Sequence, residues 1–345
     1  MCAIIGWAGK IPKGLLTRML IGAETRGKDS TGLAFRAVED GKTCNLCYRH
    51  IVPARTFVDI HKDFVGDARR SFRGIAHTRN ASPGMPIDNS NAHPYVYPWE
   101  NMGKYYFAHN GRIQNWKVIK AEQIEIYSRE LNELISEFVA LTASGEKPMT
   151  AEEVKVVLTA LAKAEREPVS KEQDALKALA EDKFNAAQGI AARLRYVENA
   201  TTDSMILGPC IENRDFSEVD GCMALVWMKA DNVYTFRSAK EAVAATVVWK
   251  YKKPASGEPA DDQLVTIVAS TKEIIEKSFD KIADAVDSDI AFINYDEGRI
   301  YRLMPNTMVD EGRVPVHQAI EDEFSSSVVE TETAEQIKIE DAGTK

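Results

Sequence analysis

The sequence predicts an α+β fold in which sheets pack against helices. Short segments rich in β-branched or aromatic residues and bounded by Gly, Asn or Asp predict strands near both ends of the chain. The expected strands cover residues 3–7, 32–38, 73–77, 105–109, 224–229, 233–237, 243–251, 265–269 and 290–295. Helical periodicity over residues 10–23 and 271–282 predicts helices between them. So many strands exclude a helical bundle, and the interspersed helices favour α+β.

The middle of the chain, residues 122–195, differs from both ends because it is rich in Ala, Glu and Lys. Two capping boxes, which begin at Thr150 and Ser170, predict helices over residues 151–165 and 171–195. A stripe of leucines and valines on the first of these helices must face another surface. Two interpretations remain open for this helical insertion: a solvated helical hairpin packed on the body, or a docking surface for a partner.

Charge is concentrated at the carboxyl end of the chain. The 345 residues carry 43 Lys and Arg against 52 Asp and Glu, a net charge of −9, and two thirds of it lies from Glu321 onward. Such a segment buries too little apolar surface to offset the entropy of ordering, so residues 313–345 are expected to form a disordered acidic tail. The rest is near neutral and has no basic stripe, which argues against nucleic acid as a direct ligand.

Several protein classes are excluded by composition. Five cysteines are too few, and odd in number, for a small disulfide scaffold. The apolar runs fall far short of the roughly 18–20 residues that a membrane helix needs. No charged-then-apolar leader opens the chain. We therefore expect a cytoplasmic protein with reduced thiols and no membrane partner.

Cys2 directly follows the initiator Met1 and is the first candidate for chemistry. Removal of Met1 would leave a cysteine with a free α-amino group, whose pKa is ordinarily about 7.7–8.0. One residue would then supply both a nucleophile and a base, because the amine can take the thiol proton directly or through water. The alternative is a buried apolar strand cysteine beside Ala3, Ile4 and Ile5.

Four further motifs follow Cys2 in order. They are Arg26-Gly27-Lys28-Asp29-Ser30, His77-Thr78-Arg79, Asn91-Ala92-His93-Pro94 and His109-Asn110-Gly111. With Cys2 they resemble the class II glutamine amidotransferases, whose pattern runs Met-Cys-Gly-Ile, Arg-Gly-x-Asp-Ser, His-Thr-Arg, Asn-x-His-Pro and His-Asn-Gly. Each motif alone is common, but five in this order at ordinary spacing are specific. The resemblance is dense over residues 2–115.

The resemblance implies a glutaminase domain with the four-layer αββα sandwich of the N-terminal-nucleophile hydrolases. Residues 2–121 and 196–312 would form this domain around the helical insertion. Cys2 would attack the side-chain amide of L-glutamine and form a γ-glutamyl thioester. The side-chain amide of Asn110 and the backbone N–H of Gly111 match the oxyanion hole of the family.

Substrate contacts also follow from the resemblance. Arg79 matches the residue that holds the α-carboxylate, a task suited to the two parallel donors of a guanidinium. Arg26 matches a position that helps to orient the nucleophile, and Ser82 stands where the family often has a threonine beside the substrate. Asp203 matches the acidic residue that binds the α-ammonium group. It lies 93 positions after Asn110, a separation that the helical insertion explains. Its alternative role is that of a turn or strand-edge aspartate.

The sequence departs from the family pattern at three positions. Ala3 replaces a glycine, Asn80 a tryptophan and Pro83 a histidine, and none of these changes removes a catalytic group. The added Cβ of Ala3 suggests reduced activity or a different amide substrate. Two alternatives therefore stand beside glutamine hydrolysis: an N-terminal-nucleophile hydrolase of another amide, or an inactive scaffold that binds a partner.

Other candidate sites are weaker. Cys44 and Cys47 form a Cys-x-x-Cys without the second pair of a zinc site. His77, His93 and His109 are better explained as hydrogen-bonded structural residues than as metal ligands. Cys210 and Cys222 are expected to be core thiols. No phosphate-binding glycine loop is present, so no cofactor is predicted. The length leaves no room for the synthetase, isomerase or phosphoribosyltransferase domains of full amidotransferases, which predicts a stand-alone glutaminase that supplies ammonia to a separate acceptor enzyme.

Overall fold

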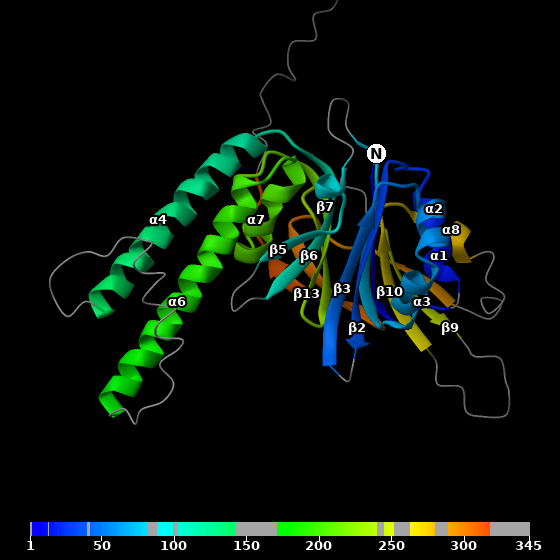
Figure 1. Cartoon of the computed structure of the whole chain (residues 1–345). Coiled ribbons are helices and arrows are strands. Elements are labelled where there is room, and N and C mark those ends of the chain that lie inside the picture. Colours follow the sequence, from blue (N-terminus) through cyan, green and yellow to red (C-terminus); the bar gives the residue numbers. More distant parts are fainter. Residues whose placement is uncertain are drawn as a thin grey trace, which may run out of the picture.

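Two antiparallel sheets lie face to face, and helices cover both outer faces, in the computed structural model of the chain (Figure 1). This arrangement confirms the predicted α+β class and its four-layer αββα sandwich, and each predicted strand overlaps an observed one. The structure describes residues 2–12, 14–39, 42–81, 88–98, 103–142, 171–239, 245–251, 263–279 and 289–317.

The first sheet has β1 near its centre. The strand order is β11-β9-β10-β1-β4-β2-β3. Their bounds are β1 Ala3–Gly9, β2 Ser30–Glu39, β3 Lys42–His50, β4 Arg73–Arg79, β9 Ala245–Tyr251, β10 Gln263–Ala269 and β11 Asp289–Ile293. Its outer face carries α1 Leu15–Ala23, α2 Ala54–Ile60, α3 Lys62–Arg70 and α8 Lys272–Phe279.

The second sheet is built around β6 and β7. Its strand order is β13-β12-β8-β7-β6-β5. The bounds are β5 Tyr95–Pro98, β6 Lys104–Ile113, β7 Gly221–Lys229, β8 Asn232–Arg237, β12 Arg299–Met304 and β13 Thr307–Arg313. Its outer face is covered by the 3-10 helix η3 Asp203–Ile206, by α7 Leu207–Asn213 and by one end of α4 Trp116–Thr142 and α6 Lys171–Glu198. A short 3-10 helix, η1 Asn89–Asn91, precedes β5.

The alternating side chains of β1 separate two layers of core. Ile5 and Trp7 are fully buried on the side of α1 and α8. Ile4 and Ala8 point the other way and pack between the sheets, against residues of the second sheet such as Val226. Because side chains on a strand alternate between its faces, one apolar strand can serve both layers. This double burial fixes β1 in the middle of the sandwich.

A pair of long helices, α4 and α6, extends from the second sheet (Figure 1). We call this pair the α4–α6 hairpin. Helix α6 occupies the region where a capping box predicts a helix over residues 171–195, whereas the helix predicted over residues 151–165 lies outside the described residues. Helix α4 was not predicted. Its apolar residues at positions 124, 127, 131, 134 and 138 recur every three or four positions, so the helical periodicity of this segment is present in the sequence.

The first residues of the predicted tail, 313–317, lie on the body. Arg313 belongs to β13, the amide of Val314 donates to the carbonyl of Gly298, and Val316 forms a β-bridge with Phe216. These backbone contacts keep residues 313–317 on the body, and the remainder of the predicted tail lies outside the described residues.

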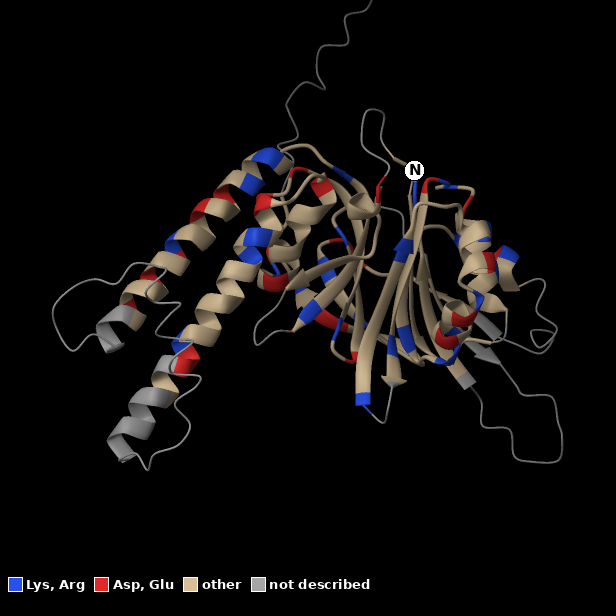
Figure 2. Cartoon of the chain, viewed as in Figure 1, with Lys and Arg blue, Asp and Glu red and all other residues tan. Residues whose placement is uncertain are grey.

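Basic and acidic residues are interspersed along the described parts of the α4–α6 hairpin and of the sheets (Figure 2). Among the helices that the structure describes, none is long and apolar enough to cross a bilayer.

The close approach of β4 to β1 gives a prediction for stability. A Cβ on Gly74 would lie 2.2 Å from the ring of Trp7 and 2.8 Å from the carbonyl oxygen of Ala34. Because both neighbours are buried, we expect Gly74→Ala to lower the free energy of unfolding by about 1–3 kcal/mol. Gly66→Ala in α3 is the control, since nothing lies within 4 Å of its new methyl group. It is expected to be neutral or to stabilise by up to about 1 kcal/mol. Denaturant unfolding of both variants measures this, and equal effects would contradict the packing at Gly74.

Candidate active site

Cys2 lies at the start of β1, beside the end of β4. The two strands pair with Ala3 opposite Thr78, which brings Cys2 next to Asn80. The Cys2 thiol donates to the carbonyl of Asn80 at 3.6 Å, and the Asn80 amide donates to the sulfur at 3.5 Å. Both contacts use the backbone of Asn80, so they do not depend on the tryptophan that the family has at this position.

The Arg-Gly-x-Asp-Ser motif holds Cys2 and Arg79 together. Arg26 Nε donates to the carbonyl of Cys2 at 2.9 Å, and the amide of Asp29 donates to the carbonyl of Arg79 at 2.9 Å. The Asp29 carboxylate accepts from the amide of Ala81 at 2.6 Å. A Cβ on Gly27 would lie 2.5 Å from the carbonyl carbon of Arg79, which explains the glycine. The motif therefore fixes the backbone on both sides of the candidate site.

Asn110 and Gly111 reach the site from β6 of the facing sheet. Asn110 Nδ2 donates to Ser270 Oγ at 3.1 Å, and the same oxygen accepts from the amide of Ile4 at 2.9 Å. Ser270 thus connects Asn110 to the strand that begins after Cys2. Gly111 has a φ of 150°, and a Cβ there would lie 2.1 Å from the carbonyl oxygen of Cys222. Only glycine fits this position.

Asp203 is the first residue of η3 and lies against the end of β6. Its Oδ2 accepts from the amide of Ile113 at 3.0 Å, and its Oδ1 accepts from Ser204 Oγ at 3.4 Å. Ser204 Oγ is also 2.8 Å from His109 Nδ1. A carboxylate offers about four acceptor sites, so these two contacts leave room for a cationic ligand. The structure thus brings Asp203 next to the His-Asn-Gly motif despite the long sequence separation.

A layer of buried histidines lies beneath the site. His77, His93 and His109 are 1–3% exposed. His77 Nε2 donates to the carbonyl of His109 at 3.1 Å, and the rings of His77 and His93 lie 4.0 Å apart. Burial lowers the pKa of His77 to about 3 and the pKa of His93 well below its usual value, so both rings are neutral. Within the described ranges, no group of three or more His, Cys, Asp or Glu side chains could hold a metal ion.

Burial and nearby charges together set the pKa of the Cys2 thiol. Burial raises the pKa of the thiol, the backbone of Asn80 and the positive charge of Arg79 oppose this shift, and the negative charge of Asp203 adds to it. The thiol is therefore neutral near pH 7 and needs a base to become a nucleophile. Arg79 and Asp203 are thus both near enough for their charges to affect the pKa of Cys2.

Ser82 and Ala3 were both expected beside the substrate. Ser82 lies outside the described residues, so its proposed contact with substrate has no structural account. Ala3 is fully buried in the cluster that contains Ile5 and Trp7, on the helix side of the sheet. Its methyl group thus points away from the space between the sheets, and the expected crowding of the substrate site by this Cβ is wrong.

The remaining cysteines do not form a site. Cys44 and Cys47 lie three residues apart on the extended strand β3, so their Cα atoms are roughly 10 Å apart and their side chains leave opposite faces. Burial raises the pKa of Cys47 to about 11, which keeps it a neutral thiol. Cys210 is buried as expected, but Cys222 is exposed, so the core prediction for Cys222 is wrong. It lies at the open end of β7, where the sheet is no longer covered.

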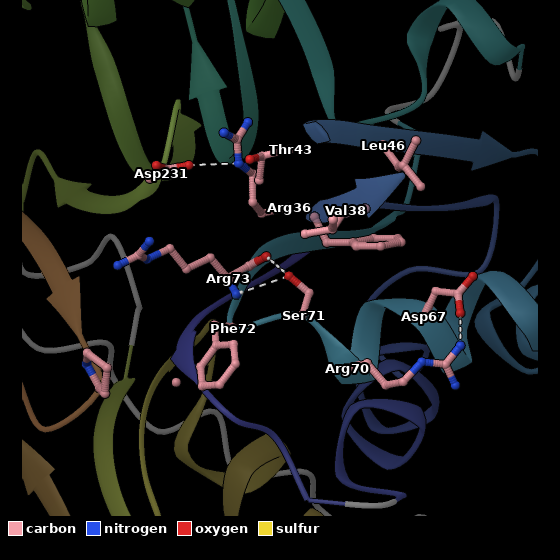
Figure 3. Close-up of a pocket in the computed structure, with 14 residues that line it drawn as sticks. Arg36, Val38, Thr43, Leu46, Asp67, Arg70, Ser71, Phe72, Arg73 and Asp231 are labelled. Carbon is pink, nitrogen blue, oxygen red and sulfur yellow. Dashed lines mark hydrogen bonds and ion pairs between the residues drawn. The ribbon is translucent and has the colours of Figure 1, made fainter. Parts of the chain in front are cut away.

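A cavity of about 730 Å³ lies at the other end of β1 (Figure 3). It is lined by Gly9, Phe35, Val38, Phe72 and Arg73, among others. Gly9 ends the strand that starts beside Cys2, and a strand of this length spans roughly 20 Å. This cavity is therefore separate from the candidate active site.

Comparison with curated proteins supports the resemblance to amidotransferases. The chain is 32% identical over 155 residues to glutamine–fructose-6-phosphate aminotransferase of Aquifex aeolicus, and 34% identical over 163 residues to that of Shouchella clausii. These alignments cover 42% and 46% of this chain. The chain is a relative of the class II glutamine amidotransferases. It spans only about a quarter of the length of these curated relatives. No family model matches it.

Two solved structures are similar to this chain at low sequence identity. One is the allosteric regulatory enzyme of purine biosynthesis, with a TM-score of 0.47 and 11% identity over 90% of this chain and 48% of that chain. The other is the glutamine phosphoribosylpyrophosphate amidotransferase of B. subtilis, with a TM-score of 0.43 and 13% identity over 90% of this chain and 49% of that chain.

The raised pKa of Cys2 predicts its reactivity in the chain that retains Met1. Because burial disfavours the thiolate, the rate of Cys2 alkylation by iodoacetamide should still rise with pH above 9, the usual pKa of a cysteine thiol. Peptide mass spectrometry separates Cys2 from the other four cysteines, and Cys2→Ser is the control. A rate that levels off below pH 8 would contradict the burial of the thiol.

Proposed function

We propose that the chain hydrolyses the side-chain amide of L-glutamine and supplies the ammonia to an acceptor enzyme. One arrangement supports this proposal: the β1–β4 pairing puts Cys2 beside Arg79, Ser270 joins Asn110 to the strand that begins after Cys2, and Asp203 accepts from the end of β6. Together they offer a nucleophile, a cation, an amide donor and an anion. These groups complement the amide, α-carboxylate and α-ammonium groups of glutamine.

In this proposal the base is the α-amino group of Cys2 after removal of Met1. The buried thiol is neutral, and an amine with a pKa of about 7.7–8.0 can take its proton. The sulfur then attacks the amide carbon, the ammonium returns a proton to the leaving nitrogen, and ammonia departs from a γ-glutamyl thioester. The same amine activates water, which cleaves the thioester to glutamate and regenerates the thiol.

The oxyanion of each tetrahedral intermediate is assigned to Asn110 Nδ2 and the backbone N–H of Gly111. Ser270 holds the Asn110 amide, so this donor is positioned before the reaction begins. Arg79 is assigned to the α-carboxylate and Asp203 to the α-ammonium group. Arg26 orients Cys2 through its carbonyl, and Ser82 remains a proposed substrate contact.

The ammonia acceptor is proposed to be a separate enzyme. The described residues form the two sheets, their covering helices and the α4–α6 hairpin, and none of these is a second catalytic domain. The matched relatives are named glutamine–fructose-6-phosphate aminotransferases, and that transfer to fructose 6-phosphate is not assigned to this chain. We propose a cytoplasmic location, where a free thiol such as Cys2 stays reduced.

The alternative functions receive less support. Hydrolysis of a different amide was suggested by Ala3, but its methyl group is buried away from the space between the sheets. An inactive scaffold would not need Ser270 to hold the Asn110 amide, or Asp203 to be held at the end of β6. Glutamine hydrolysis therefore accounts for more of the described contacts than either alternative.

The nucleophile is tested by Cys2→Ala. We expect it to abolish release of ammonia from glutamine, because it removes the proposed nucleophile, while the unfolding midpoint changes little. Coupled detection of ammonia and glutamate measures the activity. Cys222→Ala is the matched control, since that thiol is exposed on the facing sheet. Persistent hydrolysis by purified Cys2→Ala would contradict the proposed function.

The oxyanion donor is tested by Asn110→Ala. Loss of one preorganised donor should lower kcat about 10²–10³-fold and leave KM within a few-fold, because the donor acts mainly in the transition state. Steady-state kinetics with glutamine decide between the outcomes. A rise in KM with unchanged kcat would instead make Asn110 a ground-state binding residue.

A further inference from the structure

Helix α4 of the hairpin contacts the segment that carries Asp203. Lys120 Nζ donates to the carbonyls of Glu198 and Ala200, each at 2.8 Å. Gln123 Nε2 donates to the carbonyl of Ile206 at 3.3 Å. Lys120 and Gln123 are three residues apart and so lie on one face of the helix. Their contacts fall on both sides of Asp203.

The two contacts of Lys120 reach carbonyls at and just beyond the end of α6. Glu198 is the last residue of α6, and the carbonyls in the final turn of a helix have no partner within the helix. A lysine ammonium at this end also interacts favourably with the negative end of the helix dipole. Lys120 therefore caps α6 and, through Ala200, holds the chain as it leaves that helix.

The body of the protein holds the same segment from the other side. Thr201 Oγ1 donates to Asn91 Oδ1 at 2.8 Å, and Thr202 Oγ1 lies 2.8 Å from the hydroxyl of Tyr95. Asp203 thus lies in a short segment held between the hairpin and the strands.

The hairpin is itself firmly attached to the second sheet. The hydroxyl of Tyr97 on β5 donates to Glu212 at 2.9 Å and lies 2.9 Å from the hydroxyl of Tyr127 on α4. Glu212 on α7 also pairs with Arg193 on α6 at 2.8 Å, and both side chains are 12% exposed. This largely buried network links both hairpin helices to the body, so α4 can act as a fixed support.

We propose that Lys120 and Gln123 are positioning residues that set the location of Asp203, so that the α4–α6 hairpin controls affinity for the α-ammonium group of the substrate. This proposal rests on the proposed glutamine hydrolysis. It gives the α4–α6 hairpin a role in supporting the active site, in addition to any surface that it presents to a partner.

The test compares Lys120→Met with Lys117→Met, an exposed lysine on the same helix. The first substrate is glutamine, and the second is glutaramate, which is glutamine without its α-amino group. Lys120→Met should raise KM for glutamine about tenfold, as expected for loss of a charged hydrogen bond, with kcat within about twofold. Its kcat/KM for glutaramate should match that of the unaltered protein. Asp203→Asn should show the same selectivity for the α-amino group.

Equal losses on both substrates, or no loss on glutamine, would overturn the proposal. Hydrogen exchange of residues 199–206 supplies a readout independent of activity. Exchange should be faster in Lys120→Met and Gln123→Ala than in Lys117→Met, and unchanged exchange would also overturn the proposal. If the unaltered protein hydrolyses neither substrate, the proposed function fails, while the exchange result still decides whether α4 holds this segment.

Discussion

The pairing of β1 with β4 is the constraint on which the candidate site depends. The register places Ala3 opposite Thr78, so Cys2 and Arg79 lie side by side where β1 begins and β4 ends. Burial of β1 on both faces opposes a shift of this register, because a one-residue slip would put Trp7 between the sheets, where Ala8 packs. The position of the nucleophile beside its candidate carboxylate-binding arginine is therefore set by the core of the sandwich.

The facing sheet is joined to this end of the strands by polar contacts of Ser270. Ser270 accepts from both Ile4 and Asn110, so it couples the strand behind the nucleophile to the candidate oxyanion donor. Buried polar groups of this kind must be satisfied, and their geometry is specific. Apolar packing brings the sheets together, while hydrogen bonds define which backbone groups face each other at the site.

The sequence predicted much of this site because its motifs are local. The Arg-Gly-x-Asp-Ser and His-Asn-Gly motifs report turns and close backbone contacts, such as those of Gly27 and Gly111. Ser270 and Ser204 were missed because a single serine after a strand or an aspartate carries no pattern. Helix α4 was missed although its apolar residues at 124, 127, 131, 134 and 138 follow helical spacing, and the exposure of Cys222 has no signal in the strand pattern around it. The serine contacts and the exposure of Cys222 arise only when distant segments pack.

The central claim is that Cys2 becomes a free amino-terminal nucleophile in a glutamine site. Intact-protein mass spectrometry before and after incubation with a diazo-ketone analogue of glutamine tests it most directly, because one spectrum reports both loss of Met1 and reaction of the thiol. The account predicts a chain without Met1 that gains one adduct, with no adduct in Cys2→Ala. A processed chain that gains no adduct, or an adduct that persists in Cys2→Ala, would contradict it.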